Sequence, residues 1–145
     1  MKNFQTLLFI SVLNFSMTAQ TTIEDVAGFY EVTYDANNAL IIDKLILNAD
    51  GTFVFHEYDK HDLGIPPERN KYAKGTWKLE KNLILFTSGE NDLDEKHTLN
   101  FNKSKARFIS KPSRDTSSRD IKTSIRFIQS EIAWITGRTL LKSNP

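Results

Sequence analysis

The stretch that decides the fold is LILNADGTFVF, residues 45–55, in which two apolar segments flank a turn. Leu45 and Leu47 share one face of the first predicted strand, and Phe53 and Phe55 share one face of the second. The Asp-Gly pair between them supplies the residue with positive φ that a tight hairpin turn requires. The stretch therefore predicts a β-hairpin with one apolar face.

The same alternation of apolar and polar residues recurs along the chain, after one short helical turn at residues 21–25. The predicted strands are 29–34, 40–47, 52–58, 72–79, 83–87, 97–101, 106–109, 121–128, 132–136 and 139–141. Two longer polar loops are predicted at 59–71 and 111–120, and the first contains a Pro-Pro pair that cannot lie in a central strand. The fold class is therefore all-β, an antiparallel up-and-down meander of eight to ten strands. A closed barrel is favoured, because closure removes the exposed strand edges.

The first residues have the order of a secretory signal peptide. Lys2 gives a positive start, an apolar run covers 7–15, and small residues lead to Ala19. The apolar run is too short to span a bilayer. Residues 1–19 are therefore predicted to be a cleaved leader, and 20–145 a single domain.

The composition of the chain limits its cellular location and the classes of partner that it could bind. The chain has no cysteine, so we expect neither a disulfide nor the cysteine that anchors a bacterial lipoprotein. Its 19 basic and 18 acidic side chains nearly cancel, which argues against nucleic acid as the partner. We therefore expect a secreted or periplasmic protein with neither a lipid anchor nor a membrane span.

No motif for catalysis, a cofactor or a metal is found. His56 and His61 are five residues apart, a spacing that places them on opposite faces of a strand, and His97 is distant in sequence. Glu90, Asp92, Asp94 and Glu95 crowd one loop without the spacing of a calcium loop. Because no cysteine nucleophile, Gly-x-Ser-x-Gly context or glycine-rich phosphate loop is present either, we predict no enzyme, no cofactor and no metal.

Aromatic side chains are the most informative group. Those on the predicted inward faces are Tyr30, Tyr34, Phe53, Phe55, Trp77, Phe101, Phe108, Phe127 and Trp134. An eight-stranded barrel either fills with such side chains or leaves room for one small ligand, and both alternatives remain open. As ligand-binding candidates we take Tyr30, Tyr34, Phe55 and Trp77.

Gly28-Phe29-Tyr30, at the start of the first strand after a capped turn, resembles the Gly-x-Trp signature of lipocalins, with Tyr in place of Trp. The motifs DGTF at 50–53 and GTWK at 75–78 are similar to those of small secreted lipocalin-like proteins of bacteria. The resemblance implies a closed barrel with an apolar ligand in its mouth. It also implies that a basic residue near the last strand packs over the Tyr30 ring, with Arg126 and Arg138 as candidates.

Two functions are expected from these observations. In the first, the barrel binds a small apolar or amphipathic ligand. In the second, a filled barrel acts as an envelope interaction module or an inhibitor, with loops 59–71 and 111–120 as its contact surfaces.

Overall fold

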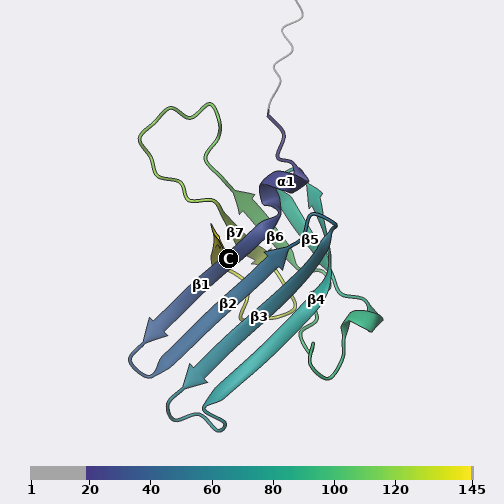
Figure 1. Ribbon diagram of the computed structural model, residues 1–145, viewed down its shortest axis with the longest axis vertical. Helices are drawn as coiled ribbons and strands as arrows, with labels where there is room; N and C mark the ends of the chain where they lie inside the picture. The colour runs from purple at the N-terminus through teal and green to yellow at the C-terminus, as the bar shows by residue number, and fades with distance from the viewer. Residues whose placement is uncertain (1–18, 145) are drawn as a thin grey trace, which may run out of the picture.

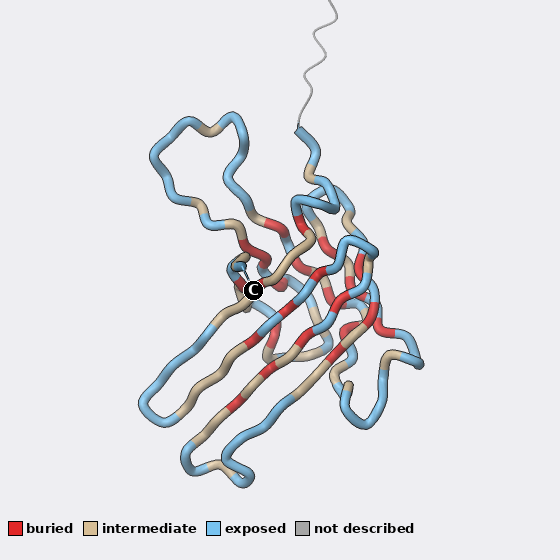
Figure 2. The backbone as a smooth tube through the Cα atoms, viewed as in Figure 1, coloured by how far each residue is buried: buried red, intermediate tan, exposed pale blue. Residues whose placement is uncertain are grey.

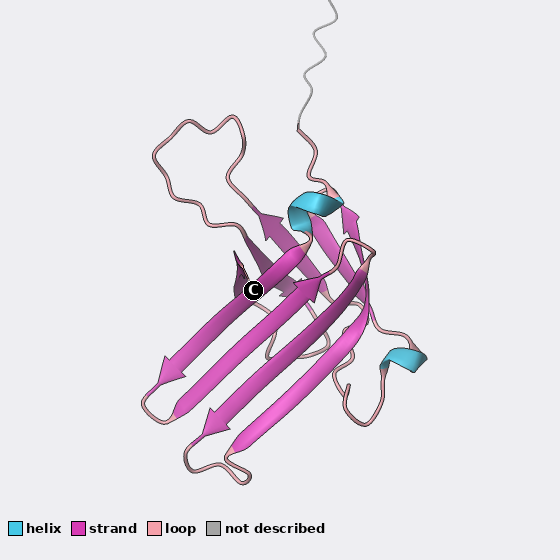
Figure 3. Cartoon of the chain, viewed as in Figure 1, coloured by secondary structure: helices cyan, strands magenta, loops and turns pink. Residues whose placement is uncertain are grey.

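The computed structural model describes residues 19–144, so the predicted leader lies outside the described residues except for Ala19. The chain forms a closed barrel of eight antiparallel strands in sequence order (Figures 1 and 3). Its strands are β1 (Gly28–Ala36), β2 (Ala39–Leu47), β3 (Thr52–His61), β4 (Glu68–Glu80), β5 (Leu83–Thr87), β6 (Lys105–Ile109), β7 (Ser124–Gln129) and β8 (Thr139–Ser143). The helices are α1 (Ile23–Val26) and the 3-10 turn η1 (Glu90–Asp92). The predicted all-β meander and its closure are confirmed.

The hairpin predicted from residues 45–55 forms between β2 and β3. Leu45 pairs with Phe55 and Leu47 with Phe53, which places all four side chains on the inner face. Gly51 has φ 86°, and the Asp50 carboxylate accepts the Thr52 backbone N–H at 2.9 Å. The turn therefore has the chemistry that its sequence indicates.

The two halves of the barrel differ in strand length. Strands β1 to β4 contain 9, 9, 10 and 13 residues, whereas β5 to β8 contain 5, 5, 6 and 5. β8 closes the barrel by pairing with only residues 29–31 of β1. The far ends of β1 to β4 consequently extend beyond the shorter strands, which Figure 1 shows at the lower left.

The core lies in the closed part of the barrel, where the red segments of Figure 2 gather. Its aromatic side chains contact one another across the interior, with ring centroids 5.0 to 5.9 Å apart. These rings belong to Phe53, Phe55, Phe86, Phe101 and Phe127. Offset and edge-to-face contacts of this kind stabilise a core beyond the area they bury. The middle of the barrel is therefore filled by side chains.

α1 covers the end of the barrel at which β1 begins. Thr22 caps it, since its hydroxyl accepts the Asp25 N–H while the Asp25 carboxylate accepts the Thr22 N–H. Val26 is fully buried, and its carbonyl accepts a 2.5 Å hydrogen bond from the Tyr30 hydroxyl. The helical turn predicted at 21–25 is thus confirmed as a capped turn fixed to the first strand.

The predicted loop at 59–71 is wrong over most of its length. β3 continues to His61, β4 begins at Glu68, and Asp59 pairs with Arg69, so the loop covers only 62–67. The polar and charged residues of this stretch predict a loop, but a strand whose inner face is not covered by a core tolerates such residues. The last strand is longer than the predicted 139–141, because Lys142 and Ser143 also belong to β8.

Two predicted strands are also absent. Residues 97–101 have no strand partner, although Phe101 is fully buried and its N–H bonds the Ser88 hydroxyl. Residues 132–136 form consecutive turns, with Ile135 N–H donating to the Ile132 carbonyl and Arg138 N–H to that of Ile135. In both segments burial of single apolar side chains produced a strand-like pattern without a strand. The loop predicted at 111–120 is longer, covering 110–123.

Candidate functional site

The inner face of the barrel changes character along β3. Its inward residues are, in order, Phe53, Phe55, Glu57, Asp59 and His61. The first two belong to the aromatic core, while the last three carry ionisable groups. The same change occurs on the neighbouring strands, where Asp43 and Lys71 flank Glu57 in register. The polar part coincides with the extension of β1 to β4 beyond the short strands.

Four charged residues form a layer directly beyond the aromatic core, which we call the polar layer: Asp43, Glu57, Lys71 and Arg138. The Arg138 guanidinium donates to the Asp43 carboxylate and, at 3.0 Å, to Glu57 Oε2. Lys71 Nζ donates to Glu57 Oε1 at 2.6 Å. Asp43 and Glu57 are 0% and 2% exposed. Two buried carboxylates are therefore held by two cations, as burial of charge requires.

Trp134, in the loop between β7 and β8, covers this layer from the side of the short strands. The Arg138 Cζ lies 4.5 Å and the Lys71 Nζ 5.0 Å from the Trp134 ring centroid. The same guanidinium lies 5.5 Å from the Tyr34 ring. Cation–π contacts with two rings add to the ion pairs and fix the plane of the guanidinium.

Asp43 is the most perturbed group of the polar layer. Burial raises the pKa of its carboxyl from 3.8 to about 6, the neighbouring Arg138 opposes this rise, and the nearby Glu57 charge adds to it. Its Oδ1 atom has no hydrogen-bond partner within residues 19–144. A buried acceptor without a partner is costly and marks a place where a ligand donor would be favourable.

Beyond the polar layer lies the inner surface that the short strands do not cover, which we call the open face: Tyr34, Ile41, Asp59, His61 and Arg69. Tyr34 is 43% exposed although its position in β1 points inward. His61 Nε2 lies 2.8 Å from Asp59 Oδ1, but the contact lacks hydrogen-bond geometry and leaves that oxygen unpartnered in the described part of the chain. Arg69 Nε is 3.9 Å from Asp59 Oδ2. The open face thus combines an accessible ring with groups that accept and donate hydrogen bonds.

The four ligand-binding candidates from the sequence do not come together. Tyr30, Phe55 and Trp77 are buried in the core, where Tyr30 bonds Val26 and the Trp77 indole N–H donates to the Asn48 carbonyl at 2.9 Å. Burial also raises the pKa of the Tyr30 hydroxyl. Only Tyr34 lies on the open face, one layer beyond the buried charges.

The sequence reasoning missed the polar layer. The available signal was the period of two in β3, which continues unbroken from Phe53 through Glu57 to His61. Trp134 and Arg138 come from a loop, and no local pattern places a loop residue against a strand that lies about ninety positions earlier in the chain.

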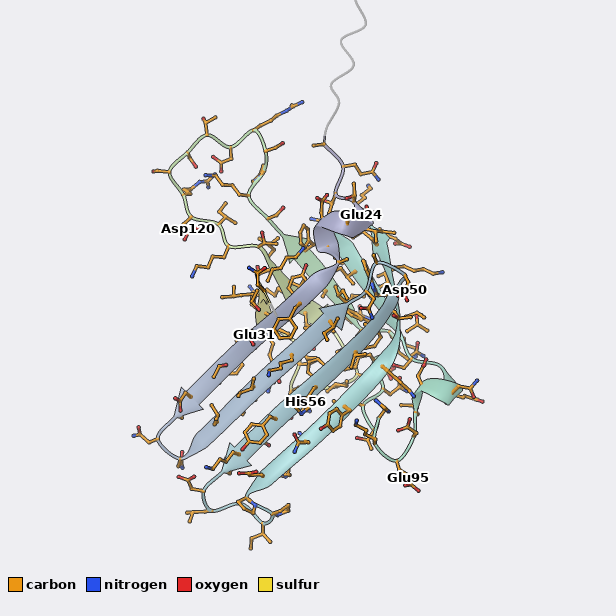
Figure 4. The ribbon with its side chains drawn as sticks, in the orientation of Figure 1. Glu24, Glu31, Asp50, His56, Glu95 and Asp120 are labelled. Carbon is orange, nitrogen blue, oxygen red and sulfur yellow. The ribbon has the colours of Figure 1, made fainter. Side chains whose placement is uncertain are left out.

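The histidines do not form a metal centre in the part of the chain that the structure describes, where no group of three or more ligands is found. His56, labelled on β3 in Figure 4, stacks on Tyr72 at 4.5 Å and bonds Asn70. His61 is on the inner face, and His97 bonds Asp94. Hydrogen bonds from His97 and Lys74 hold the pKa of the Asp94 carboxyl below its usual range.

The basic residue expected over the first-strand ring is neither Arg126 nor Arg138. Lys142 of β8 takes this place, with its Nζ 5.8 Å from the Tyr30 ring centroid and donating to the Asp25 carbonyl at 2.6 Å. Gly28 has φ 145°, a conformation that residues with a side chain rarely adopt, and a Cβ there would also lie 2.7 Å from Lys142 Cε, so the lysine would have to shift. The α1 turn, the first strand and the last strand are therefore joined by one lysine.

Comparisons with protein-family models, curated proteins and solved structures find no match to this chain. Within residues 19–144, no helix is long and apolar enough to cross a membrane.

Proposed function

We propose that this protein is an exported lipocalin-like binding protein that holds a small amphipathic molecule at the open end of its barrel. The observation that carries the proposal is Tyr34, an inward-facing aromatic residue that is 43% exposed. It lies beside a layer of buried charges at the end where the barrel is not covered by short strands. A ring in this position offers apolar surface that a ligand would remove from water, at roughly 25 cal/mol per Å².

Three features support a lipocalin-like barrel. The eight strands close in sequence order, α1 covers one end, and Lys142 ties the Gly-x-Tyr motif of β1 to the last strand. The proposed leader at 1–19 supports export, to the periplasm or the exterior, and the absence of cysteine supports an unanchored protein. The proposal includes no catalytic step and no cofactor.

The proposed binding mode places the ligand on the open face rather than in the barrel centre, which is filled by five phenylalanine rings. The apolar part would pack on Tyr34 and Ile41. A donor group would meet the Asp59 carboxylate, whose Oδ1 lies 2.8 Å from His61 Nε2, and an acceptor group would meet Arg69. Few polar groups beside an apolar surface are typical of small-molecule sites.

The experiment is native mass spectrometry of the protein purified from its own secretory route, followed by titration with the amphipathic fluorophore anilinonaphthalene sulfonate. Tyr34→Ala is expected to weaken binding of the fluorophore by about tenfold, because it removes the accessible ring. Tyr58→Ala is the matched control, since Tyr58 belongs to β3 but faces outward. Equal affinities of the two variants would contradict the proposed site.

A second candidate function is a filled barrel that acts through its loops. It is favoured by the loop between β3 and β4, where Leu63 and Ile65 are 94% and 98% exposed. Two exposed aliphatic side chains in one short loop offer apolar surface that a protein partner could cover. In this case Leu63→Ser with Ile65→Ser would abolish binding to a protein partner, and Tyr34→Ala would leave it unchanged.

A further inference from the structure

A cleft lies at the opposite end of the barrel from the open face. It has a volume of about 870 Å³ and is bounded by residues 19–25, the turn at Asn82, the end of β6 and the start of the loop 110–123. Figure 1 shows this long loop and α1 on the same end of the barrel. The volume is that of a site for a small organic molecule.

The walls of this cleft carry an excess of positive charge. Its basic residues are Arg107, Lys111, Arg114 and Lys142, and its only carboxylate is that of Asp25. The Asp25 carboxylate is already engaged by the Thr22 N–H at 2.8 Å and the Thr22 hydroxyl at 2.9 Å. The lining of the cleft therefore holds four basic residues and one carboxylate, and a low-dielectric concave surface strengthens the resulting positive potential.

Arg107 lies beside a like charge on the neighbouring strand. It pairs in register with Arg126 of β7, so two guanidinium groups project from neighbouring positions on the same face of the sheet. Like charges directly opposite each other destabilise a strand pair. Neither arginine has a hydrogen bond or an ion pair within the described range 19–144. An anion beside Arg107 would offset this repulsion.

The remaining walls are partly apolar. Phe108, Ile109 and Pro112 line the same cleft. We infer that this cleft binds a small organic phosphate, whose oxyanion is held by Arg107 and Lys111 and whose carbon skeleton lies against Ile109 and Pro112. Arginine donates two parallel hydrogen bonds to a phosphate, and lysine adds a mobile charge. This inference is independent of the proposed function, because the two sites share no residue.

The test is isothermal titration calorimetry of the purified protein at low ionic strength with two probes, inorganic phosphate and hexyl phosphate. Both are expected to bind, and hexyl phosphate should gain affinity over inorganic phosphate through its chain. Arg107→Gln and Lys111→Gln should each weaken binding of hexyl phosphate, by about tenfold for the arginine. Thermal unfolding of each variant confirms that the barrel is intact, which is expected because both side chains are exposed.

Lys78→Gln is the matched control, because Lys78 is an exposed lysine on β4 that does not line the cleft. It should change the affinity by less than about twofold, whereas a nonspecific charge effect would weaken binding as much as Lys111→Gln. Absence of binding to the unaltered protein, or equal losses in Lys78→Gln and Arg107→Gln, would overturn the inference. Tyr34→Ala should leave phosphate binding unchanged, so failure of the open-face proposal is distinguished from failure of this one.

A comparison with vesicles distinguishes two sources of the phosphate group, a free small molecule and a lipid headgroup. Vesicles of phosphatidylcholine with phosphatidic acid present the same phosphate on a surface. Co-sedimentation with these vesicles in the absence of hexyl phosphate binding would overturn the inference in favour of a lipid surface. Binding of hexyl phosphate without co-sedimentation would support it.

Discussion

At the scale of single residues, the free-energy cost of burying the charges of the polar layer falls mainly on Asp43. Its side chain is fully buried, its Oδ2 is paired with Arg138, and its Oδ1 is unpartnered in the described chain. Because burial raises the pKa of this carboxyl to about 6, the folded protein holds a proton there at a pH where the unfolded chain has lost it. The contribution of Asp43 to stability is therefore full below about pH 4 and is lost as pH rises through about 6.

This gives a pH-dependent prediction for Asp43→Asn, which cannot ionise. The free energy of unfolding of the variant, minus that of the unaltered protein, should increase between about pH 4 and pH 7, by up to about 3 kcal/mol. Urea denaturation at several pH values measures it. Asp50→Asn is an opposing control, because hydrogen bonds from Thr52 lower the pKa of the Asp50 carboxyl. Asp50→Asn should lower the free energy of unfolding near neutral pH, and this loss should become smaller as the pH falls. A difference for Asp43→Asn that does not change with pH would contradict the assignment.

At the scale of elements, alternation predicted the strands wherever one face meets the core. Leu45, Phe53 and Phe55 lie inward as their spacing indicates, and β5 has the predicted bounds of 83–87. The pattern failed where burial is not periodic, as at 97–101, and where a strand has no apolar core on its inner face, as at 59–61. The polar layer falls in this second class, so the sequence indicated the barrel but not the site.

Gly75 of β4 lies where the backbone of β5 and a side chain of β3 approach it closely, which leads to a prediction. A Cβ at this position would lie 2.2 Å from the Thr87 carbonyl oxygen and 2.9 Å from the Phe53 ring. Gly75→Ala should therefore separate β4 from β5 and destabilise the barrel by about 1–3 kcal/mol or more, measured by urea denaturation. Gly137→Ala is the matched control, since Gly137 also has a positive φ, of 90°, but a Cβ there would meet nothing within 4 Å. A similar loss of stability in both variants would show that the backbone conformation of glycine, and not the close contact, causes the destabilisation.

At the scale of the whole molecule, unequal strand length links the fold to the proposed site. A barrel of eight equal strands would cover the inner face of each strand along its whole length, whereas here the ends of β1 to β4 form a four-stranded sheet with an uncovered inner face. Figure 2 shows these ends as mainly intermediate and exposed. The arrangement leaves charged and aromatic side chains accessible on a surface that the filled barrel keeps in place.

Hydrogen exchange should reveal this division. Amides in the extension, at 33–41 and 59–69, should exchange faster than those at 44–56, because local opening there exposes few packed apolar groups. Addition of anilinonaphthalene sulfonate should slow exchange in the extension only, since a ligand on Tyr34 would supply the packing that this sheet lacks. Hexyl phosphate should instead protect residues near the cleft at the other end. Mass spectrometry of peptic fragments measures each region separately. Uniform protection along β1 to β4 would show that the extension is as stable as the barrel without a ligand, which the open-face proposal does not accommodate.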